Sequence, residues 1–254
     1  MAIDELTVVL SPYGTDPVTG KAYLPHPTQQ KILDLVRAIR NGQSLTKGIT
    51  TIYLQHGVGA GGTRAMLTPA IEMLLECPGL KALICRKEYA SLRVSAMETF
   101  FEIVPEAIIA EQNEQEHRYE LSGPDGNGIV YFNGVEEVAK MGSQDFALLV
   151  IVECHELGER QFRALRNRCR QAGYPHVILM EGNPPPEGHW LSQLTDPDHV
   201  HYDADILKIE LSSYENWAYL PPEYRATLER MPASWRRRYL MGKTGFITAG
   251  TPVY

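Results

Sequence analysis

A glycine-rich segment that directly follows a short apolar run constrains this chain more than any other feature. Residues 52–54 read as part of a buried strand, and residues 57–62 then hold four glycines in six positions. Backbone N–H groups converge on an anion through conformations that a Cβ obstructs, so this layout is typical of a phosphate-binding loop. A glycine-rich turn without a ligand is the alternative interpretation. The candidate nucleotide-binding residues here are Gly57, Val58, Gly59, Ala60, Gly61, Gly62, Thr63 and Arg64.

The common phosphate-loop pattern G-x-x-x-x-G-K-[ST] contains a lysine that reaches the β- and γ-phosphates, and this loop lacks it. In one register Thr63 is the hydroxyl that faces Mg²⁺, Gly62 stands at the lysine position and His56 at the first glycine. In the other register Gly57 and Gly62 are the pattern glycines, Thr63 replaces the lysine and Arg64 the hydroxyl. We favour the first register because it keeps the hydroxyl. A lysine introduced at position 62 is then expected to increase turnover.

Hydrophobic patterning along the rest of the chain predicts buried strands that alternate with amphipathic helices. The strands are predicted at residues 50–55, 80–85, 147–152, 176–180 and 206–211. The helices are predicted at residues 27–41, 63–76, 91–103 and 159–171, with two short ones after Pro221 and near Pro232. Residues 108–133 read as two or three antiparallel strands. The alternation predicts an α/β fold with a mainly parallel central sheet flanked by helices.

The length of 254 residues suits one large α/β domain, or one domain with a small appendage. Residues 1–26 are rich in Pro, Gly and Tyr and are predicted to form an N-terminal arm. Residues 27–205 carry the alternating pattern and form the predicted core. Residues 206–254 read as a small lid or linker subdomain.

Composition narrows the function classes. The 24 basic and 31 acidic residues give a net charge of −7, which argues against a protein that coats nucleic acid over its whole surface. A local basic patch such as residues 236–238 remains compatible with this charge. No apolar stretch approaches the roughly 18 residues of a membrane span, and the N-terminus lacks a secretion signal. The four cysteines show no C-x-x-C pairing, so we expect reduced thiols and no structural zinc.

A carboxylate follows the most apolar predicted strand. The strand at 147–152 leads directly into Glu153, and in open parallel sheets the functional residues lie at the carboxyl ends of the strands. Nucleoside triphosphatases keep a metal ligand and a water-orienting base at such a position, although a surface turn or a helix cap fits an acidic strand end equally. A metal site built from His155, Glu156 and His117 has no supporting spacing.

A second polar strand end is the third candidate feature, after the glycine loop and Glu153. The strand at 176–180 is followed by Asn183 and then by prolines that turn the chain away. The asparagine can hydrogen-bond a γ-phosphate or an attacking water, whereas the simpler interpretation is a strand that ends in a Pro-rich turn. The glycine loop, Glu153 and Asn183 occur in the order that a P-loop NTPase with an additional catalytic strand requires.

These ordered motifs resemble the N-terminal ATPase motor domain of the large terminase subunit of tailed bacteriophages. The resemblance covers most of the chain, and the ordered set is more specific than any single motif. The segments that carry it lie at residues 24–29, 55–63, 82–93, 129–134, 151–157, 182–191 and 239–254.

The resemblance implies a role for individual residues and implies ATP and Mg²⁺ as cofactors. Glu153 would be the catalytic carboxylate that orients the attacking water, and Asn183 would sense the γ-phosphate. Thr63 would bind Mg²⁺, and Gln29 would contact the adenine.

Two departures from the family pattern bear on catalysis. The phosphate-loop lysine is absent, and Val152 stands at the first acidic position of the strand end. Both missing groups neutralise charge in phosphoryl transfer, so their loss should cost several kcal/mol of transition-state stabilisation. Either Arg64 or Arg86 compensates, or the chain hydrolyses ATP poorly when alone and an arginine supplied by a neighbouring subunit restores the rate. The candidates for such a trans arginine are Arg160, Arg163 and Arg166.

The resemblance also implies partners. A packaging motor couples ATP hydrolysis to translocation of double-stranded DNA into a procapsid, through non-specific backbone contacts. It works as a homo-oligomeric ring on a portal protein, with a small terminase subunit, in the host cytoplasm. The family's nuclease domain is not expected within this chain. The alternatives are a nucleotide-binding or assembly module with weak or no hydrolysis, and a helicase-like P-loop ATPase unrelated to packaging.

Overall fold

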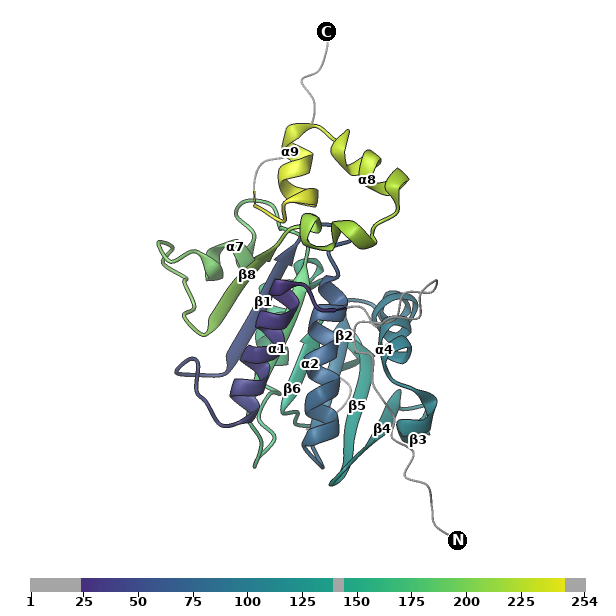
Figure 1. The fold of residues 1–254 in the computed structure, drawn as a ribbon. Coiled ribbons are helices and arrows are strands. Elements are labelled where there is room, and N and C mark those ends of the chain that lie inside the picture. The colour runs from purple at the N-terminus through teal and green to yellow at the C-terminus, as the bar shows by residue number, and fades with distance from the viewer. Residues whose placement is uncertain (1–23, 139–143, 245–254) are drawn as a thin grey trace.

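The computed structural model describes residues 24–138 and 144–244 and shows an α/β architecture around one eight-stranded sheet (Figure 1). The strands are β1 (Thr50–His56), β2 (Lys81–Arg86), β3 (Ile109–Asn113), β4 (Arg118–Gly123), β5 (Gly126–Gly134), β6 (Leu148–Ile151), β7 (Val177–Gly182) and β8 (Ile206–Leu211). Their order is β3-β4-β5-β2-β6-β7-β1-β8. Neighbours from β5 to β8 pair in parallel, whereas β3, β4 and β5 pair antiparallel. The predicted α/β class with a mainly parallel sheet is confirmed.

Helices cover both faces of the sheet. One face packs against α1 (Pro27–Arg40), α2 (Gly62–Glu76), α3 (Tyr89–Leu92) and α4 (Glu98–Ile103), which share one buried apolar cluster with the sheet. The other face packs against α5 (Val135–Val138), α6 (Glu159–Arg166) and α7 (Trp190–Thr195), which belong to a second cluster. Because helices cover both faces, β1, β6 and β7 are buried at every position, and their central residues are mainly apolar.

The strand order places β7 between the two strands that lead into the predicted site residues. β7 lies between β1, which leads into the glycine-rich segment, and β6, which leads into Glu153. The carboxyl ends of all three parallel strands therefore meet at one edge of the sheet. This arrangement brings residues from three distant segments together.

Three elements differ from the predictions. The strand at 206–211 pairs in parallel with β1 as the edge of the central sheet, so it is not part of a separate appendage. The helix predicted at 159–171 ends at Arg166, because the carbonyl oxygen of Arg168 and the N–H of Gln171 form backbone hydrogen bonds with Phe146 instead. Helix α7 was not predicted. The remaining division into arm, core and lid stays a prediction, and residues 1–23 and 245–254 lie outside the described part.

The last described elements lie beyond the carboxyl ends of the strands (Figure 1). They are α8 (Pro222–Glu229), α9 (Ala233–Trp235) and the following helical turn Arg236–Leu240. This region contacts the glycine-rich segment, because the N–H of Val58 donates to the carbonyl of Tyr239. The helical turn Ser213–Tyr219 contacts the same segment, because the hydroxyl of Ser213 donates to the carbonyl of Val58. Among the described helices, none has both the length and the apolar character needed to cross a membrane. The four cysteines are free thiols, as expected.

Candidate functional site

A pocket of about 370 Å³ lies at the carboxyl edge of the sheet, against the glycine loop, which we define as residues 57–62. Residues 58–64 line it together with His56, Thr99, Glu153 and Asn183. The structure therefore brings the predicted loop residues next to the polar residues that follow β6 and β7. Gly57 and Gln29 are not part of its lining.

The loop backbone presents the start of α2 to this pocket. Gly59 and Gly61 have φ angles of +68° and +81°, a left-handed conformation that favours glycine. The N–H groups of Gly57 and Val58 donate to the carbonyls of Leu211 and Tyr239, so the fold itself uses these two donors. The first N–H groups of a helix have no acceptor within the helix, and they carry the positive end of its dipole. The anion-binding capacity of the loop therefore concentrates in the first turn of α2.

Gln29 supports the loop from the side of α1. Its side-chain amide donates to the carbonyl oxygen of Gly61 at 3.4 Å. His26, the N-cap of α1, lies with Nε2 3.2 Å from the carbonyl oxygen of Ala60. Both side chains are buried, so they hold the loop backbone in place. The adenine contact assigned to Gln29 by resemblance stays a prediction.

Glu153 occupies a strained position across the pocket. Its φ and ψ of 50° and 48° lie in the left-handed region, which is rare for a residue with a side chain and concentrates at functional sites. Its Oε2 lies 3.4 Å from Nδ1 of His155. Neither atom has a hydrogen-bond partner of suitable geometry within the described residues, although both are buried. A buried carboxylate oxygen without a donor is ready to bind another group.

The environment of Glu153 matches a general base. Burial, with a further contribution from the negative charge of Glu181, raises the pKa of Glu153 to about 7, while His56 and Arg86 act in the opposite direction. A proton acceptor works best when its pKa lies near the operating pH. Deprotonation of Glu153 is therefore accessible at neutral pH, and its conjugate acid is stable enough to hold a proton.

The raised pKa predicts a pH-dependent stability difference for Glu153→Gln. A carboxyl group with a raised folded-state pKa stabilises the fold while it is protonated, so the wild type loses stability as pH rises from the unfolded pKa towards 7. Glutamine stays neutral and escapes this loss. Relative to wild type, the variant should gain roughly 1–3 kcal/mol of unfolding free energy between pH 5 and pH 8, measured by urea denaturation.

Glu156→Gln provides a control of opposite sign. The Arg86 guanidinium, which donates to Glu156 at 3.0 and 2.6 Å, lowers the pKa of that carboxyl. Its stabilising contribution is present above the unfolded pKa and is lost as pH falls through the folded pKa, so this variant should be the less stable protein at pH 8. Equal pH profiles for the Glu153→Gln variant and the wild type would contradict the raised pKa.

Sequence reasoning did not identify Glu181, which joins the components of the site. Its side chain is fully buried at the end of β7, with Oε2 2.5 Å from Nε2 of His56. Its Oε1 accepts from the hydroxyl of Thr63 at 3.3 Å and from the N–H of Glu153 at 3.4 Å. Burial by itself lowers the pKa of His56, but the hydrogen bond and charge of Glu181 outweigh it and raise that pKa. A glutamate ending an otherwise apolar strand was the available sequence signal.

The other predicted residues take distinct positions. Asn183 lines the pocket and donates from Nδ2 to the carbonyl oxygen of His56 at 3.0 Å, which ties β7 to β1. The two cations expected to replace the lysine both pair with glutamates. Arg64 contacts Glu102 at 2.5 Å, and Arg86 binds Glu156. The roles assigned to Asn183 and to these arginines remain predictions.

Few side-chain oxygen atoms at the pocket are available as ligands for Mg²⁺. Val152 is 2% exposed and packs in the apolar cluster on the α2 face, so the first acidic position is part of the core. Thr63 and Glu153 do provide oxygen atoms at the pocket, which suits a cation that prefers oxygen ligands. No group of three or more His, Cys, Asp or Glu side chains suited to a metal occurs in residues 24–138 and 144–244. His117 stacks on Tyr89 instead, with ring centroids 3.9 Å apart.

The arginines proposed to act in trans lie on α6, on the opposite face of the sheet from α2. Arg163 pairs with Glu159 on its own helix at 2.6 Å. Arg166 binds Asp203 at 2.5 Å and Asp205 at 3.2 Å. Arg160 is exposed and lines a cavity of about 730 Å³ beside α5 and α6. Arg160 is therefore the best placed of the three to meet another molecule.

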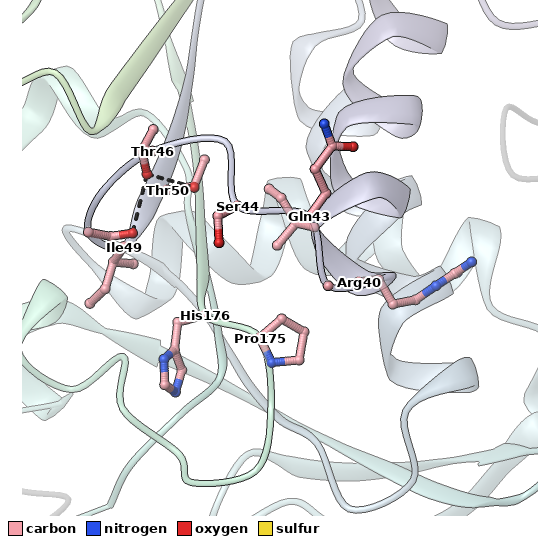
Figure 2. Close-up of a pocket in the computed structure, with 11 residues that line it drawn as sticks. Arg40, Gln43, Ser44, Thr46, Ile49, Thr50, Pro175 and His176 are labelled. Atoms are coloured by element: carbon pink, nitrogen blue, oxygen red, sulfur yellow. Dashed lines mark hydrogen bonds between the residues drawn. The ribbon is translucent and has the colours of Figure 1, made fainter.

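Another pocket, of about 480 Å³, lies at the amino end of β1, opposite the glycine loop (Figure 2). Its wall includes Arg40, Gln43, Pro175 and His176. The hydroxyl of Thr46 bonds to that of its neighbour Thr50 at 2.8 Å, as the dashed line in Figure 2 marks. None of the predicted site residues lines this pocket, so it serves as an internal comparison for the site at the other end of β1.

Solved structures of large terminases resemble this fold. The large terminase of a thermophilic bacteriophage in complex with ADP gives a TM-score of 0.69 at 15% identity, covering 86% of this chain and 53% of that one. The HK97 bacteriophage large terminase gives 0.66 at 14% identity, covering 92% and 53%. The ATPase domain of the Thermus phage P74-26 large terminase gives 0.55 at 15% identity, covering 87% and 94%. The chain thus spans about half the length of the first two proteins.

The sequence itself matches a family. No curated protein sequence matches it significantly. A family model described as phage terminase large subunit, however, matches residues 50–245, which include all eight strands. Because that match covers most of the chain, this protein belongs to the phage terminase large subunit family, and its fold is that of the family's ATPase domains.

Proposed function

We propose that the pocket beside the glycine loop binds ATP with Mg²⁺ and that the chain hydrolyses it. The observation that carries this proposal is the position of Glu153, a strained and partly buried carboxylate across one pocket from the start of α2. The large terminase of the thermophilic bacteriophage has been solved with ADP and with ATP-γ-S, which supports nucleotide binding by this fold.

Each residue has a role in this proposal. The N–H groups of Gly62 and Thr63, in the first turn of α2, bind phosphate oxygens. The Thr63 hydroxyl would face Mg²⁺, which when bound neutralises charge on the phosphates. Glu153 orients a water molecule and accepts its proton. Asn183, fixed to the backbone of His56, contacts the terminal phosphate or that water.

The proposed biological role is DNA packaging. The chain would couple ATP hydrolysis to translocation of double-stranded DNA into a procapsid, as a homo-oligomeric ring on a portal protein with a small terminase subunit, in the host cytoplasm. Family membership supports this role. Within such a ring, Arg160 is exposed and is our candidate for an arginine that reaches a neighbouring pocket. Because the net charge is −7, the non-specific contacts with the DNA backbone would be few and confined to the pore of the ring.

A nucleotide-binding module with weak or no hydrolysis is the second candidate. The observation that favours it is the apolar burial of Val152 together with the absence of a lysine at Gly62. Both changes remove groups that stabilise charge in the transition state more than in the bound nucleotide.

A binding and turnover experiment separates the candidates. ADP binding is measured by calorimetry with and without Mg²⁺, and phosphate release is measured from ATP with and without double-stranded DNA. We expect Mg²⁺-dependent binding that Thr63→Val weakens by roughly tenfold or more, because the variant loses the proposed metal-facing hydroxyl. Thr46→Val removes a hydroxyl in the pocket at the other end of β1 and serves as the matched control.

The possible results are distinct. Binding with DNA-stimulated turnover supports the motor, whereas binding without turnover at any protein concentration supports the second candidate. Absence of ADP binding at millimolar concentration contradicts both. Equal losses in Thr63→Val and Thr46→Val would contradict the assignment of the pocket.

A further inference from the structure

A buried pair of ionisable side chains lies directly beneath the start of α2. Nε2 of His56 lies 2.5 Å from Oε2 of Glu181, and the glutamate side chain is fully buried. Nδ1 of the same ring lies 2.9 Å from the carbonyl oxygen of Gly57. Both ring nitrogens therefore face oxygen atoms. Burying such a pair is costly unless its hydrogen bonds are complete, which they are here.

The His56 ring occupies the space that a side chain at position 62 would need. A Cβ added to Gly62 would approach ring atoms Cδ2 and Nε2 closer than 3.0 Å, a separation that real Cβ atoms essentially never show. In the favoured register, position 62 is the lysine position and position 56 is a glycine position. Relative to the phosphate-loop pattern, the large side chain therefore stands at position 56 and the glycine at position 62. For the same reason, the single change Gly62→Lys is no longer expected to increase turnover.

Glu181 supplies a carboxylate near the strand end where Val152 supplies none. Val152 is in the core and contributes no carboxylate. Oε1 of Glu181, from the neighbouring strand β7, instead accepts from the Thr63 hydroxyl and from the backbone N–H of Glu153. Because β7 lies between β1 and β6, its end reaches both the glycine loop and the end of β6. A carboxylate thus contacts the Thr63 hydroxyl in this protein, but it comes from β7 and not from the end of β6.

We infer that His56 and Glu181 are positioning residues that together replace the missing lysine and the missing first strand-end carboxylate. Glu181 orients the Thr63 hydroxyl and the backbone of Glu153, and His56 holds the loop and completes the pocket wall with a polar ring. The missing lysine and the missing carboxylate are then replaced together by one hydrogen-bonded pair, His56 and Glu181. This inference rests on the proposed function, because it assigns the pair to the same phosphate pocket.

Reversal of this arrangement at positions 56 and 62 tests the inference. Four full chains are compared, namely the wild type, Gly62→Lys, His56→Gly and the double variant. Each single change should lower Tm by several degrees, because one creates a steric overlap and the other leaves Glu181 without its partner. The double variant should recover most of the loss, since the lysine can occupy the vacated space and approach the carboxylate. ADP affinity should fall roughly tenfold in His56→Gly and return to within about threefold of wild type in the double variant.

A fallback set of variants and a matched control keep the comparison interpretable. If Gly62→Lys does not fold, then His56→Ala, Gly62→Ala and their combination test the same contact with smaller changes. Gly48→Ala combined with His56→Gly is the matched control, because a Cβ at residue 48 meets the carboxylate of Asp205 at the opposite end of β1. Substitutions this far apart should lower Tm additively.

The outcomes separate this inference from the proposed function. If the Tm losses of Gly62→Lys and His56→Gly simply add in the double variant, as they should in the control, the inference is overturned whether or not ADP binds. A double variant that regains Tm but binds ADP as weakly as His56→Gly also overturns it, because the pair would then be purely structural. If none of these proteins binds ADP but the Tm losses are still non-additive, the proposed function is contradicted. The steric contact between positions 56 and 62 is then supported on its own.

Discussion

A Glu153→Gln variant is expected to release phosphate from ATP at least about 100-fold more slowly than the wild type, with ADP affinity within about threefold. Glutamine keeps the size of the side chain, but it does not accept a proton. The Glu153 carboxylate lines the pocket opposite the first turn of α2, and burial raises its pKa to about 7, so it combines the position and the basicity that water activation requires. Phosphate release at saturating ATP, with double-stranded DNA present, measures the effect.

Glu156→Gln is the matched control for this experiment. The two glutamates lie three positions apart, but Glu156 binds Arg86 and is absent from the pocket lining. Its substitution should leave turnover within a few-fold of wild type. Turnover that is unchanged in Glu153→Gln would remove Glu153 from the mechanism, and equal losses in both variants would assign the effect to the local backbone.

Glu181→Ala is expected to lower the unfolding free energy by about 3–5 kcal/mol, the range for removing one partner of a buried ion pair. The change leaves the buried ring of His56 without its acceptor and removes the acceptor of the Thr63 hydroxyl. It also opens a cavity where a fully buried side chain was packed. Urea denaturation at pH 7 measures the loss.

Two further substitutions serve as controls for this prediction. Glu181→Gln keeps an oxygen acceptor and nearly the same volume, so it should cost less than the alanine variant. Glu187→Ala changes an exposed glutamate six residues along the chain and should stay within about 0.5 kcal/mol of wild type. A loss of less than about 1 kcal/mol in Glu181→Ala would mean that water solvates the pair, contrary to its burial.

The sheet and most of its strands could be predicted from sequence because each depends on a local pattern. Continuous apolar runs at β6 and β7 indicate strands that are covered on both faces, and the structure buries both throughout. Helix α1 follows its apolar spacing in the same way. The prediction for α6 was wrong at its end, because residues beyond Arg166 bond to Phe146, a contact that local periodicity does not report.

The candidate site was only partly predictable. Glycine density and polar strand ends identified the loop, Glu153 and Asn183, and the structure places them around one pocket. The same reasoning treated positions 62 and 152 as simple losses. Glu181 was missed, because a glutamate at the end of an apolar strand has no distinct pattern until its neighbours in space are known.

Local patterns in the chain were enough to define the alternation of strands and helices, the glycine loop and the order of the polar strand ends, because these features depend on residues that are close in sequence. Folding in three dimensions was needed to establish that β8 forms the sheet edge and that His56 meets a carboxylate 125 residues away. The parallel sheet brings the ends of β1, β7 and β6 side by side, and side-chain volume then sets which groups can coexist there. Such contacts between distant segments leave no periodicity in the sequence, so they emerge only when the chain is folded.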